Sequence, residues 1–512
     1  MPCLWLLPAS VKADSSQKSI FQDDDHLIYN STSVVQETVA RLAGLGVNEL
    51  RITVKWSAIA PDAASRVVPA GFDPTDPADY LASAWAPYDR VVRLAQAYGM
   101  SVEFNVTAPG PLWAMQPDAP TSADADHWEP NPAQFKAFVE ALGTRYSGRY
   151  EGIPRVSVWS IWNEPNEPGW LAPQSVTVNG SVVAASADLY RNEMREAFAG
   201  LYATGHLSGH DLVLIGDLAS TGYDPPGSDT AIAPMVFLRA LYCVDLHYRR
   251  LLGASASALG CPTGGSERSF VDRNPALFFA GGFAHHPYYF DGPPSQPPGP
   301  DIVALANLGV LEGGLDRAMR AWGVRRHVPI YIDEWGEKSN PPDSYQDVTL
   351  ADQAAYINQG QYIAWRDPRV RSMAQFLLYD TLPDDRYPVS DARHWRTFQT
   401  GLQFANGTAK PSLAAYRTPI WVPQAKVAGG HGLLVWGEVR RYRQALGRQA
   451  LVQWRGHHRW TTIATVKLTH AQGYFTVVVQ IPATGSLRLT WRLKSSPATT
   501  YSSRTVPVTV GR

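Results

Sequence analysis

The stretch VSVWSIWNEPNEPGW, residues 156–170, decides how the rest of this 512-residue chain is interpreted. Its first half is β-branched and aromatic, which is typical of a parallel strand that is covered on both faces. Pro165 cannot continue the strand because it has no backbone N–H, so Glu164 lies where the strand becomes a loop. Taken alone, a glutamate at this position fits a strand cap or an ion pair with arginine as well as it fits catalysis.

A second carboxylate follows a similar strand later in the chain. The stretch VPIYIDEWG, residues 328–336, is again a short apolar run, and it ends in Glu334, an aromatic residue and a glycine. Between residues 20 and 419 such runs alternate with segments of helical periodicity, which predicts an α/β fold, a (β/α)8 TIM barrel. The carboxyl ends of the strands form one face of such a barrel, so both glutamates are expected on that face.

The Asn-Glu-Pro and Glu-Trp-Gly motifs resemble the acid/base and nucleophile strands of the clan A glycoside hydrolases. The resemblance extends over about residues 20–419, includes families 5 and 39, and indicates the clan better than the family. It implies that Glu164 is the acid/base and Glu334 the nucleophile of a glycosidase that hydrolyses O-glycosidic bonds by a retaining, two-step mechanism. A transglycosylase and a non-catalytic carbohydrate-binding barrel remain open, as do the sugar, the linkage and exo or endo action.

The same resemblance assigns roles to residues on other strands. Arg51 resembles the arginine that keeps the nucleophile ionised, although an ordinary structural ion pair is the alternative. Asn163 is expected to hydrogen-bond the 2-hydroxyl of the attacked sugar. His286 and Tyr288, in the stretch FAHHPYY, resemble the pair that flanks the nucleophile. The tyrosine would donate a hydrogen bond to the nucleophile, and the histidine would contact the substrate or the acid/base.

Two tryptophans are predicted to contact the sugar. Trp335 directly follows Glu334, and Trp113 lies in a rigid, proline-rich strand exit, where packing within the loop is an equal alternative. The adjacent His285 and His286 prompt a metal hypothesis, but neither a helical HExxH spacing nor a set of cysteine ligands accompanies them. No metal or other cofactor is therefore expected.

The composition is that of a folded protein, with 45% hydrophobic and 18% charged residues. The formal net charge of −1, without a long run of one sign, argues against nucleic acid as a partner. The 17 tryptophans favour a carbohydrate partner, since flat aromatic faces stack on sugar rings, although large cores also contain tryptophan. No apolar stretch reaches the ~18 residues needed to span a bilayer, and the sequence does not indicate an oligomeric state.

The N-terminus and the cysteines favour export. Residues 1–19 contain a short apolar run from Cys3 to Val11 and are predicted to be a leader or part of a signal peptide. Cys243 and Cys261 then remain as an even pair in one loop-rich segment, so a disulfide in an oxidising compartment is predicted, with two free thiols as the alternative. The protein is expected to be secreted.

The composition changes at about residue 420. From there to residue 512, short segments with period-two alternation are separated by turn residues, which predicts an antiparallel β-sandwich of immunoglobulin-like type. This domain either binds polysaccharide through Trp454 or Trp460 or only supports the barrel. The sequence shows no row of exposed aromatic residues, so the supporting role is favoured.

Overall fold

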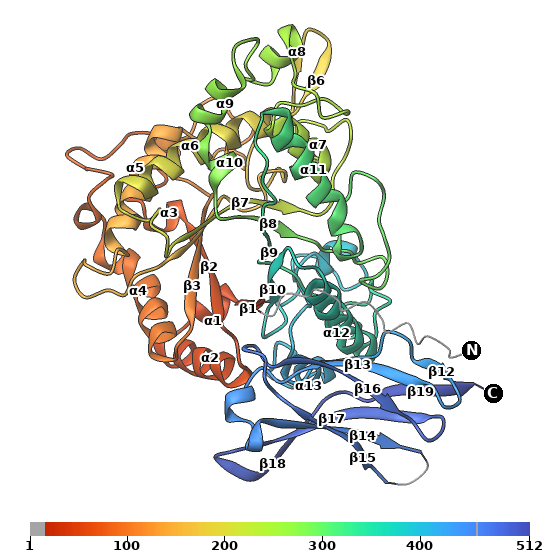
Figure 1. Cartoon of the computed structure of the whole chain (residues 1–512). Helices are drawn as coiled ribbons and strands as arrows, with labels where there is room; N and C mark the ends of the chain where they lie inside the picture. The colour runs from red at the N-terminus through yellow and green to blue at the C-terminus, as the bar shows by residue number, and fades with distance from the viewer. Residues whose placement is uncertain (1–15, 457–458, 512) are drawn as a thin grey trace.

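The structure is a computed structural model that describes residues 16–456 and 459–511. Its larger part is a closed barrel of eight parallel strands, in the order β1-β10-β9-β8-β7-β4-β3-β2 (Figure 1). The predicted (β/α)8 barrel is therefore confirmed. The strands are β1 (Lys18–Gln22), β2 (Glu49–Lys55), β3 (Ser101–Thr107), β4 (Val158–Ile161), β7 (Leu212–Ala219), β8 (Gly282–His286), β9 (Ile330–Ile332) and β10 (Val370–Phe376).

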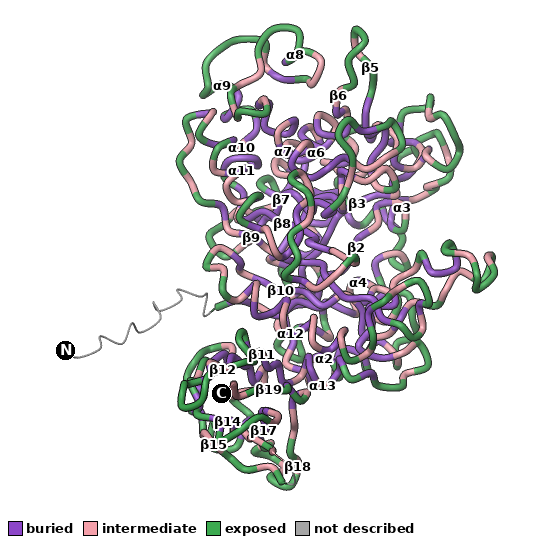
Figure 2. The backbone as a smooth tube through the Cα atoms, turned by 90° about the vertical axis from the view of Figure 1, so that its right-hand side faces the viewer, coloured by how far each residue is buried: buried purple, intermediate pink, exposed green. Residues whose placement is uncertain are grey.

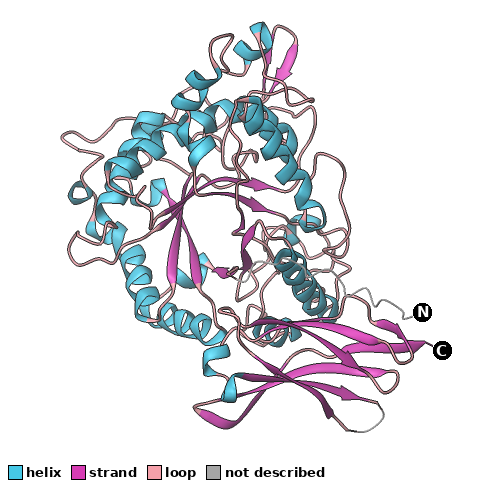
Figure 3. Ribbon diagram, in the orientation of Figure 1, coloured by secondary structure: helices cyan, strands magenta, loops and turns pink. Residues whose placement is uncertain are grey.

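Helices surround the barrel (Figure 3). In α5, Asn131 caps the first turn by accepting backbone N–H groups, Pro132 occupies the first helical position, and Phe135 and Phe138 are buried. Burial of each such side chain contributes about 1.5–3 kcal/mol. The longer helices are α2 (Thr32–Leu45), α4 (Ala82–Ala97), α5 (Pro132–Arg145), α6 (Ala185–Ala203), α7 (Pro234–Leu241), α11 (Leu308–Ala321) and α12 (Leu350–Arg366). The shorter ones are α1 (Asp24–Leu27), α3 (Trp56–Ile59), α8 (Gly253–Ala258), α9 (Glu267–Arg273), α10 (Pro275–Phe279) and α13 (Pro411–Arg417).

The barrel strands are buried on both sides, and the exposed backbone lies mainly in the connecting loops (Figure 2). The side chains that face the helices are apolar, whereas several that face the barrel axis are polar and fully buried, among them Arg51, Glu103 and Asp217. Burial of a charged group is costly unless it is paired. The polar side chains inside the barrel therefore need partners there.

A long excursion follows β7 and contains α7 to α10. Cys243, just after α7, forms a disulfide with Cys261, just after α8, with Cα atoms 5.7 Å apart. The hairpin of β5 (Val176–Val178) and β6 (Ser181–Val183) extends from the same part of the molecule (Figure 1). The predicted pairing of the two cysteines is thus present in the structure.

The C-terminal domain consists of two sheets. One has the order β11-β13-β16 and the other β12-β19-β17-β14-β15, with β18 paired to β17. The predicted two-sheet arrangement is present, but the immunoglobulin likeness holds only in general terms, because β12 and β19 pair in parallel. The strands are β11 (Ile420–Trp421), β12 (Lys426–Ala428), β13 (Gly432–Glu438), β14 (Gln449–Arg455), β15 (Thr461–Lys467), β16 (Tyr474–Gln480), β17 (Gly485–Leu493), β18 (Ser496–Ser502) and β19 (Val506–Gly511).

The smaller sheet packs against the barrel. Trp436 of β13 and Tyr474 of β16 form an aromatic cluster with Tyr362 and Trp365 of α12. The larger sheet lies on the far side of the domain (Figure 1). One side of the sandwich therefore supports the barrel, and the other remains open.

At the N-terminal boundary, β1 begins at Lys18, two residues before the predicted start of the barrel domain. Register with β10 explains this, because Lys18 pairs with Ser372 and Ser19 with Met373. The predicted leader falls mostly on residues 1–15, which lie outside the described residues. Among the described residues, no helix combines the length and the hydrophobicity required to cross a membrane.

Candidate active site

Two glutamates face each other at the carboxyl ends of the barrel strands. Glu164 follows β4 and Glu334 follows β9, and their side chains are 18% and 10% exposed. One carboxylate oxygen of each lies within 4.8 Å of the other and of a ring nitrogen of His286. The pair is therefore close, nearly enclosed and still reachable from the mouth of the barrel.

The backbone at this position is strained. Trp162, Glu164 and Asp217 have positive φ angles of 66°, 41° and 46°, in the left-handed region that residues other than glycine rarely adopt. The backbone N–H of Glu164 donates to the carbonyl of Asp217 at 3.0 Å, which ties the end of β4 to β7. Such strain typically costs about 1–3 kcal/mol per residue and concentrates at functional sites.

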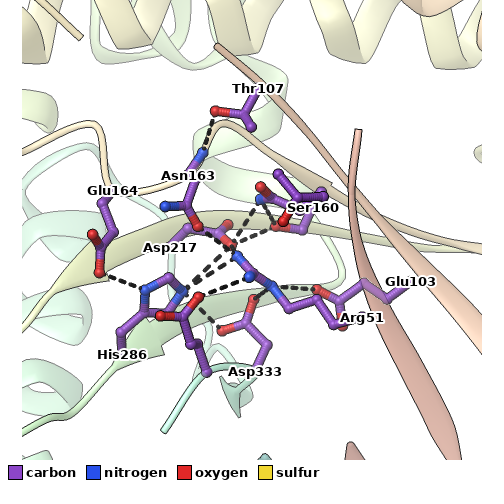
Figure 4. Close-up of polar contacts among 12 residues, drawn as sticks. Arg51, Glu103, Thr107, Ser160, Asn163, Glu164, Asp217, His286 and Asp333 are labelled. Carbon is purple, nitrogen blue, oxygen red and sulfur yellow. Dashed lines mark hydrogen bonds and ion pairs between the residues drawn. The ribbon is translucent and has the colours of Figure 1, made fainter. Parts of the chain in front are cut away.

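Arg51 of β2 is the centre of the buried polar layer (Figure 4). Its Nη1 donates to Oε2 of Glu334 at 3.0 Å, and its Nη2 donates to Asn163 at 2.8 Å and to Asp217 at 3.1 Å. Its Nε lies 3.2 Å from a carboxylate oxygen of Asp333. Because Arg51 has no exposure to solvent, these carboxylates are what make its burial tolerable.

Three carboxyl groups around Arg51 differ in protonation. Although burial opposes it, hydrogen bonds and charges from His286 and Arg51 hold the pKa of Asp217 below its ordinary value. Burial, and then the charge of Asp217, raise the pKa of Asp333 to about 8. Burial, with Asp333 as the next cause, raises the pKa of Glu103 well above its ordinary value. Asp217 is therefore the ionised member, and Asp333 and Glu103 hold protons at neutral pH.

His286 of β8 connects the two halves of this cluster. Its Nδ1 lies 2.8 Å from Oε1 of Glu164, and its Nε2 faces Asp217 at 3.8 Å and Asp333 at 3.6 Å. Burial favours the neutral ring, but the surrounding carboxylates, Glu334 foremost, raise the pKa of His286 well above its ordinary value. The imidazolium donates to Glu164 and is a second cation beside Arg51.

Glu334 is held by donors on both oxygens. Burial raises its pKa, and the charges of His286 and Arg51 oppose that rise. The O–H of Tyr288 donates to Oε1 of Glu334 at 3.1 Å and also favours the ionised form. Burial and the charge of Glu334 raise the pKa of Tyr288 well above its ordinary value, so the phenol keeps the proton that it donates.

Two cavities meet at the glutamate pair. One, of about 330 Å³, is lined by Asn163 and by polar residues at the ends of β1 and β2, including Asp24 and Lys55. The other, of about 660 Å³, lies toward β7 and β8 and includes Tyr289. Glu164, Glu334 and Phe398 line both cavities. A ligand that filled both would place the bond between its two parts directly at the carboxylates.

Within residues 16–456 and 459–511, two groups of side chains have the geometry of a metal site. These are Glu164 with His286 and Glu334, and Asp217 with His286 and Asp333, each with three potential ligand atoms within 4.8 Å of one another. The guanidinium of Arg51 already pairs with Glu334, Asp217 and Asp333. A divalent cation would have to compete with this fixed positive charge, so the residues fit an internal ion-pair cluster better than a metal site.

Among the residues predicted from the sequence, six lie together at the ends of the barrel strands, joined by hydrogen bonds: Glu164, Glu334, Arg51, Asn163, His286 and Tyr288. The two tryptophans lie elsewhere. The Trp335 ring packs against Gly360 of α12 and is 1% exposed. The indole N–H of Trp113 donates to the carbonyl of Pro61, and its ring packs edge-on against Trp56. Neither tryptophan is among the residues that line the two cavities.

The sequence analysis missed the acids beneath the pair. Asp217, Asp333 and Glu103 contact Arg51, and Gln22 accepts a hydrogen bond from it at 2.6 Å. The signal was available, since each is a polar residue within or at the end of an otherwise apolar barrel strand. Such a residue on the inner face of a barrel needs a partner there.

No protein-family model and no curated protein sequence matches this chain. Solved structures do match over most of its length. An endo-beta-1,4-mannanase from Thermotoga petrophila covers 98% of this chain and 99% of its own, at 12% identity and a TM-score of 0.42. A beta-glycosidase from Thermosphaera aggregans covers 75% of this chain and 83% of its own, at 16% identity and a TM-score of 0.41. A family 1 b-glucosidase from Thermotoga maritima covers 75% and 84%, at 14% identity and a TM-score of 0.43. Sequence identities and TM-scores this low do not justify assigning the activity of these proteins to this chain, so its function has to be inferred from the site itself.

Proposed function

We propose that the protein is a retaining glycosidase that hydrolyses O-glycosidic bonds by two successive displacements. The observation that carries the proposal is the close approach of Glu164 and Glu334, within 4.8 Å at the nearest oxygens. Retaining enzymes hold their two carboxyl groups about 5–5.5 Å apart, whereas inverting enzymes need about 6.5–9.5 Å to admit a water molecule. The different partners of the two glutamates support separate roles.

In the first step Glu334 attacks the anomeric carbon. Arg51 and Tyr288 hold its carboxylate in the ionised form that a nucleophile needs. Glu164 gives its proton to the departing oxygen, so the glycosidic C–O bond breaks as the bond to Glu334 forms. The leaving part of the substrate is released as an alcohol, and the sugar remains as an ester of Glu334.

In the second step Glu164 is the base. It removes a proton from water, the water oxygen attacks the anomeric carbon, and Glu334 departs as a carboxylate. His286 donates to Glu164 and so stabilises the charged form that this step requires. Two inversions at one carbon leave its configuration unchanged.

The two cavities support a binding place for each part of the substrate. The smaller one contains Asn163, whose Oδ1 accepts from Arg51 while its amide N–H group remains available to a sugar hydroxyl. The attacked sugar therefore binds there, and the leaving group binds in the larger cavity with Tyr289. Secretion is part of the proposal and is supported by the Cys243–Cys261 disulfide, which is typical of oxidising compartments.

Proton NMR of the first-formed sugar tests the mechanism. A panel of aryl glycosides identifies a substrate, and spectra taken before mutarotation give the configuration of the product. We expect the configuration of the substrate to be retained. A product of opposite configuration would refute the covalent mechanism and the role of Glu334. Absence of turnover on the whole panel would favour a binding barrel, and preferential transfer to an added alcohol would favour a transglycosylase.

A further inference from the structure

The net charge of the chain conceals a strong asymmetry between its domains. Residues 420–512 contain 13 lysines and arginines and a single acid, Glu438, which is a formal charge of +12. The whole chain carries −1, so residues 1–419 carry −13. A charge concentrated in this way raises the local concentration of oppositely charged partners and is a property of a binding surface, independent of the fold.

The larger sheet of this domain, β12-β19-β17-β14-β15, carries part of that charge on its outer face, which points away from the domain core. Side chains alternate along β17: Leu487, Leu489 and Trp491 are in the core, so Arg488 and Arg492 point the other way. Gln453 of β14 pairs with Arg488 in register and accepts a hydrogen bond from its Nε at 2.9 Å. A cavity of about 410 Å³ lies over this face, lined by Gln449, Gln453, Arg488, Thr490, Arg492 and Thr500 among others.

An aromatic ring borders this basic face. The guanidinium carbons of Arg488 and Arg455 lie 4.2 Å and 4.7 Å from the centre of the Trp460 ring. The two arginines are close enough to repel, and burial and then the charge of Arg455 lower the pKa of Arg488. An anion between them would relieve that repulsion.

The one acid of the domain does not neutralise this face. Glu438 lies at the end of β13, in the smaller sheet, where it is buried and paired with Arg440 at 3.2 Å. That sheet packs on α12, whereas β14 and β17 lie on the side away from the barrel (Figure 1). The positive charge of the outer face is therefore offered to solvent.

We propose that the outer face of the β14–β17 sheet, which we call the basic face, binds an acidic polysaccharide whose carboxylates pair with Arg488 and Arg492. Amide and hydroxyl side chains between the arginines suit the hydroxyl groups of the same sugars, and the Trp460 ring holds the guanidinium of Arg488 in place. The choice of polysaccharide over other polyanions rests on the proposed glycosidase function, since a binding domain beside a glycosidase site keeps the enzyme at its polymer.

Polygalacturonate is the probe, and the same polymer with all its carboxylates methyl-esterified is the matched neutral control. Binding is measured with the full-length chain carrying Glu334→Gln, so that turnover does not consume the polymer. We expect R488Q/R492Q to weaken polygalacturonate binding at least about tenfold, since two charge-assisted hydrogen-bond donors are lost. R488K/R492K retains the charge and should lose less.

The control variant K426Q/R443Q removes the same charge from exposed residues that do not line the cavity. It should change affinity by less than about threefold, because separated surface charges are screened. Thermal unfolding of each variant reports whether it is folded, and the lysine variant provides the test if the glutamine variant is not.

Three outcomes would overturn the proposal: equal binding of the esterified polymer, equal weakening by both glutamine variants, or tighter binding of single-stranded DNA or phosphatidylglycerol vesicles than of polygalacturonate. The binding measurement does not require turnover, so its outcome is independent of the outcome of the NMR test. A chain that binds the polymer but hydrolyses no glycoside would refute only the proposed function. A glycosidase that does not bind it would refute only the role of the basic face.

Discussion

Tyr288→Phe isolates one hydrogen bond at the proposed nucleophile. The phenol donates to Oε1 of Glu334 at 3.1 Å, and the substitution removes this donor while leaving the ring in place. A hydrogen bond to a charged group contributes about 1.5–3 kcal/mol, and one pKa unit corresponds to about 1.4 kcal/mol. Since Tyr288 stabilises the ionised form, its loss should raise the pKa of Glu334 by about 1–2 units.

The consequence for activity has a definite sign. Glu334 must be ionised to attack, so a higher pKa moves the acid limb of the kcat/KM profile toward higher pH by about 1–2 units. The second step regenerates the carboxylate and loses the stabilisation that Tyr288 gave to it. Hydrolysis of the glycosyl-enzyme should therefore slow more than its formation, and an activated aryl glycoside should show a burst of released phenol.

The measurement is a pH–rate profile of Tyr288→Phe beside that of Tyr289→Phe. Tyr289 lines the same cavity, but its hydroxyl accepts a hydrogen bond from Gln296 at 3.1 Å, whereas the phenol that donates to Glu334 is that of Tyr288. Its removal should leave the acid limb in place. An unmoved acid limb in Tyr288→Phe, or the same movement in both variants, would contradict the view that the phenol controls ionisation of Glu334.

Three further outcomes are expected. Glu164→Gln should slow hydrolysis of substrates with poor leaving groups by about 10²–10⁴-fold and that of activated aryl glycosides much less; equal losses would remove Glu164 from the role of acid. Asp333→Asn should make stability less sensitive to pH. Wild-type Asp333 holds a proton up to a pKa of about 8 that the unfolded chain releases near its ordinary pKa, so wild-type stability falls with rising pH across that window. Urea unfolding of the variant should show a fall that is shallower by on the order of 1 kcal/mol per pH unit, because Glu103, whose pKa is also raised, still contributes in the same direction. Replacing Cys243 and Cys261 together by serine should cost about 3 kcal/mol in the same assay, given their separation of 18 residues, and an unchanged unfolding midpoint would speak against a stabilising bridge.

The strand pattern was sufficient to predict the barrel. Apolar runs ending in polar residues are local features, and the two runs within residues 156–170 and 328–336 are the barrel strands β4 and β9. The bounds were less predictable, because β1 is extended to Lys18 by pairing with β10, which is distant in the sequence. The parallel pairing of β12 and β19 at the edge of the sandwich is equally a matter of long-range contacts.

Site residues that belong to a sequence motif were predicted, whereas those distinguished only by their burial in the structure were missed. Glu164 and Glu334 stand in recognisable local contexts at strand ends. Asp333 is next to Glu334 in the same stretch, and an acid at the end of an apolar barrel strand indicates that a buried partner is needed. The local sequence does not identify Arg51 as that partner. Trp335 shows the converse, since its place in a motif suggested a sugar contact, whereas the packing of α12 holds its ring in the wall of the barrel.

Net charge was the weakest of the sequence-level quantities. A value of −1 summed over 512 residues suggested no electrostatic preference for a partner, yet it is the balance of an acidic barrel and a basic sandwich. The prediction that nucleic acid is not a partner came from that sum. Charge has to be counted by domain before it can exclude a class of partner. The prediction about nucleic acid is therefore tested by comparing the binding of polygalacturonate and of DNA to the basic face.

The buried cluster around Arg51 also explains how one site serves both proposed steps. The proposed mechanism begins with a proton on Glu164, so in its first step Glu334 and Asp217 are the two anions opposite Arg51 and the imidazolium of His286. In the intermediate Glu334 is an ester and Glu164 has become the anion, again two against two. An unpaired charge is costly where water is excluded. The total charge of the cluster is the same at the start of the reaction and in the intermediate, so neither step has to create an unpaired charge. The ionised Asp217, held by Ser160 and Asn105 as well as by Arg51, is the fixed partner that makes this balance hold.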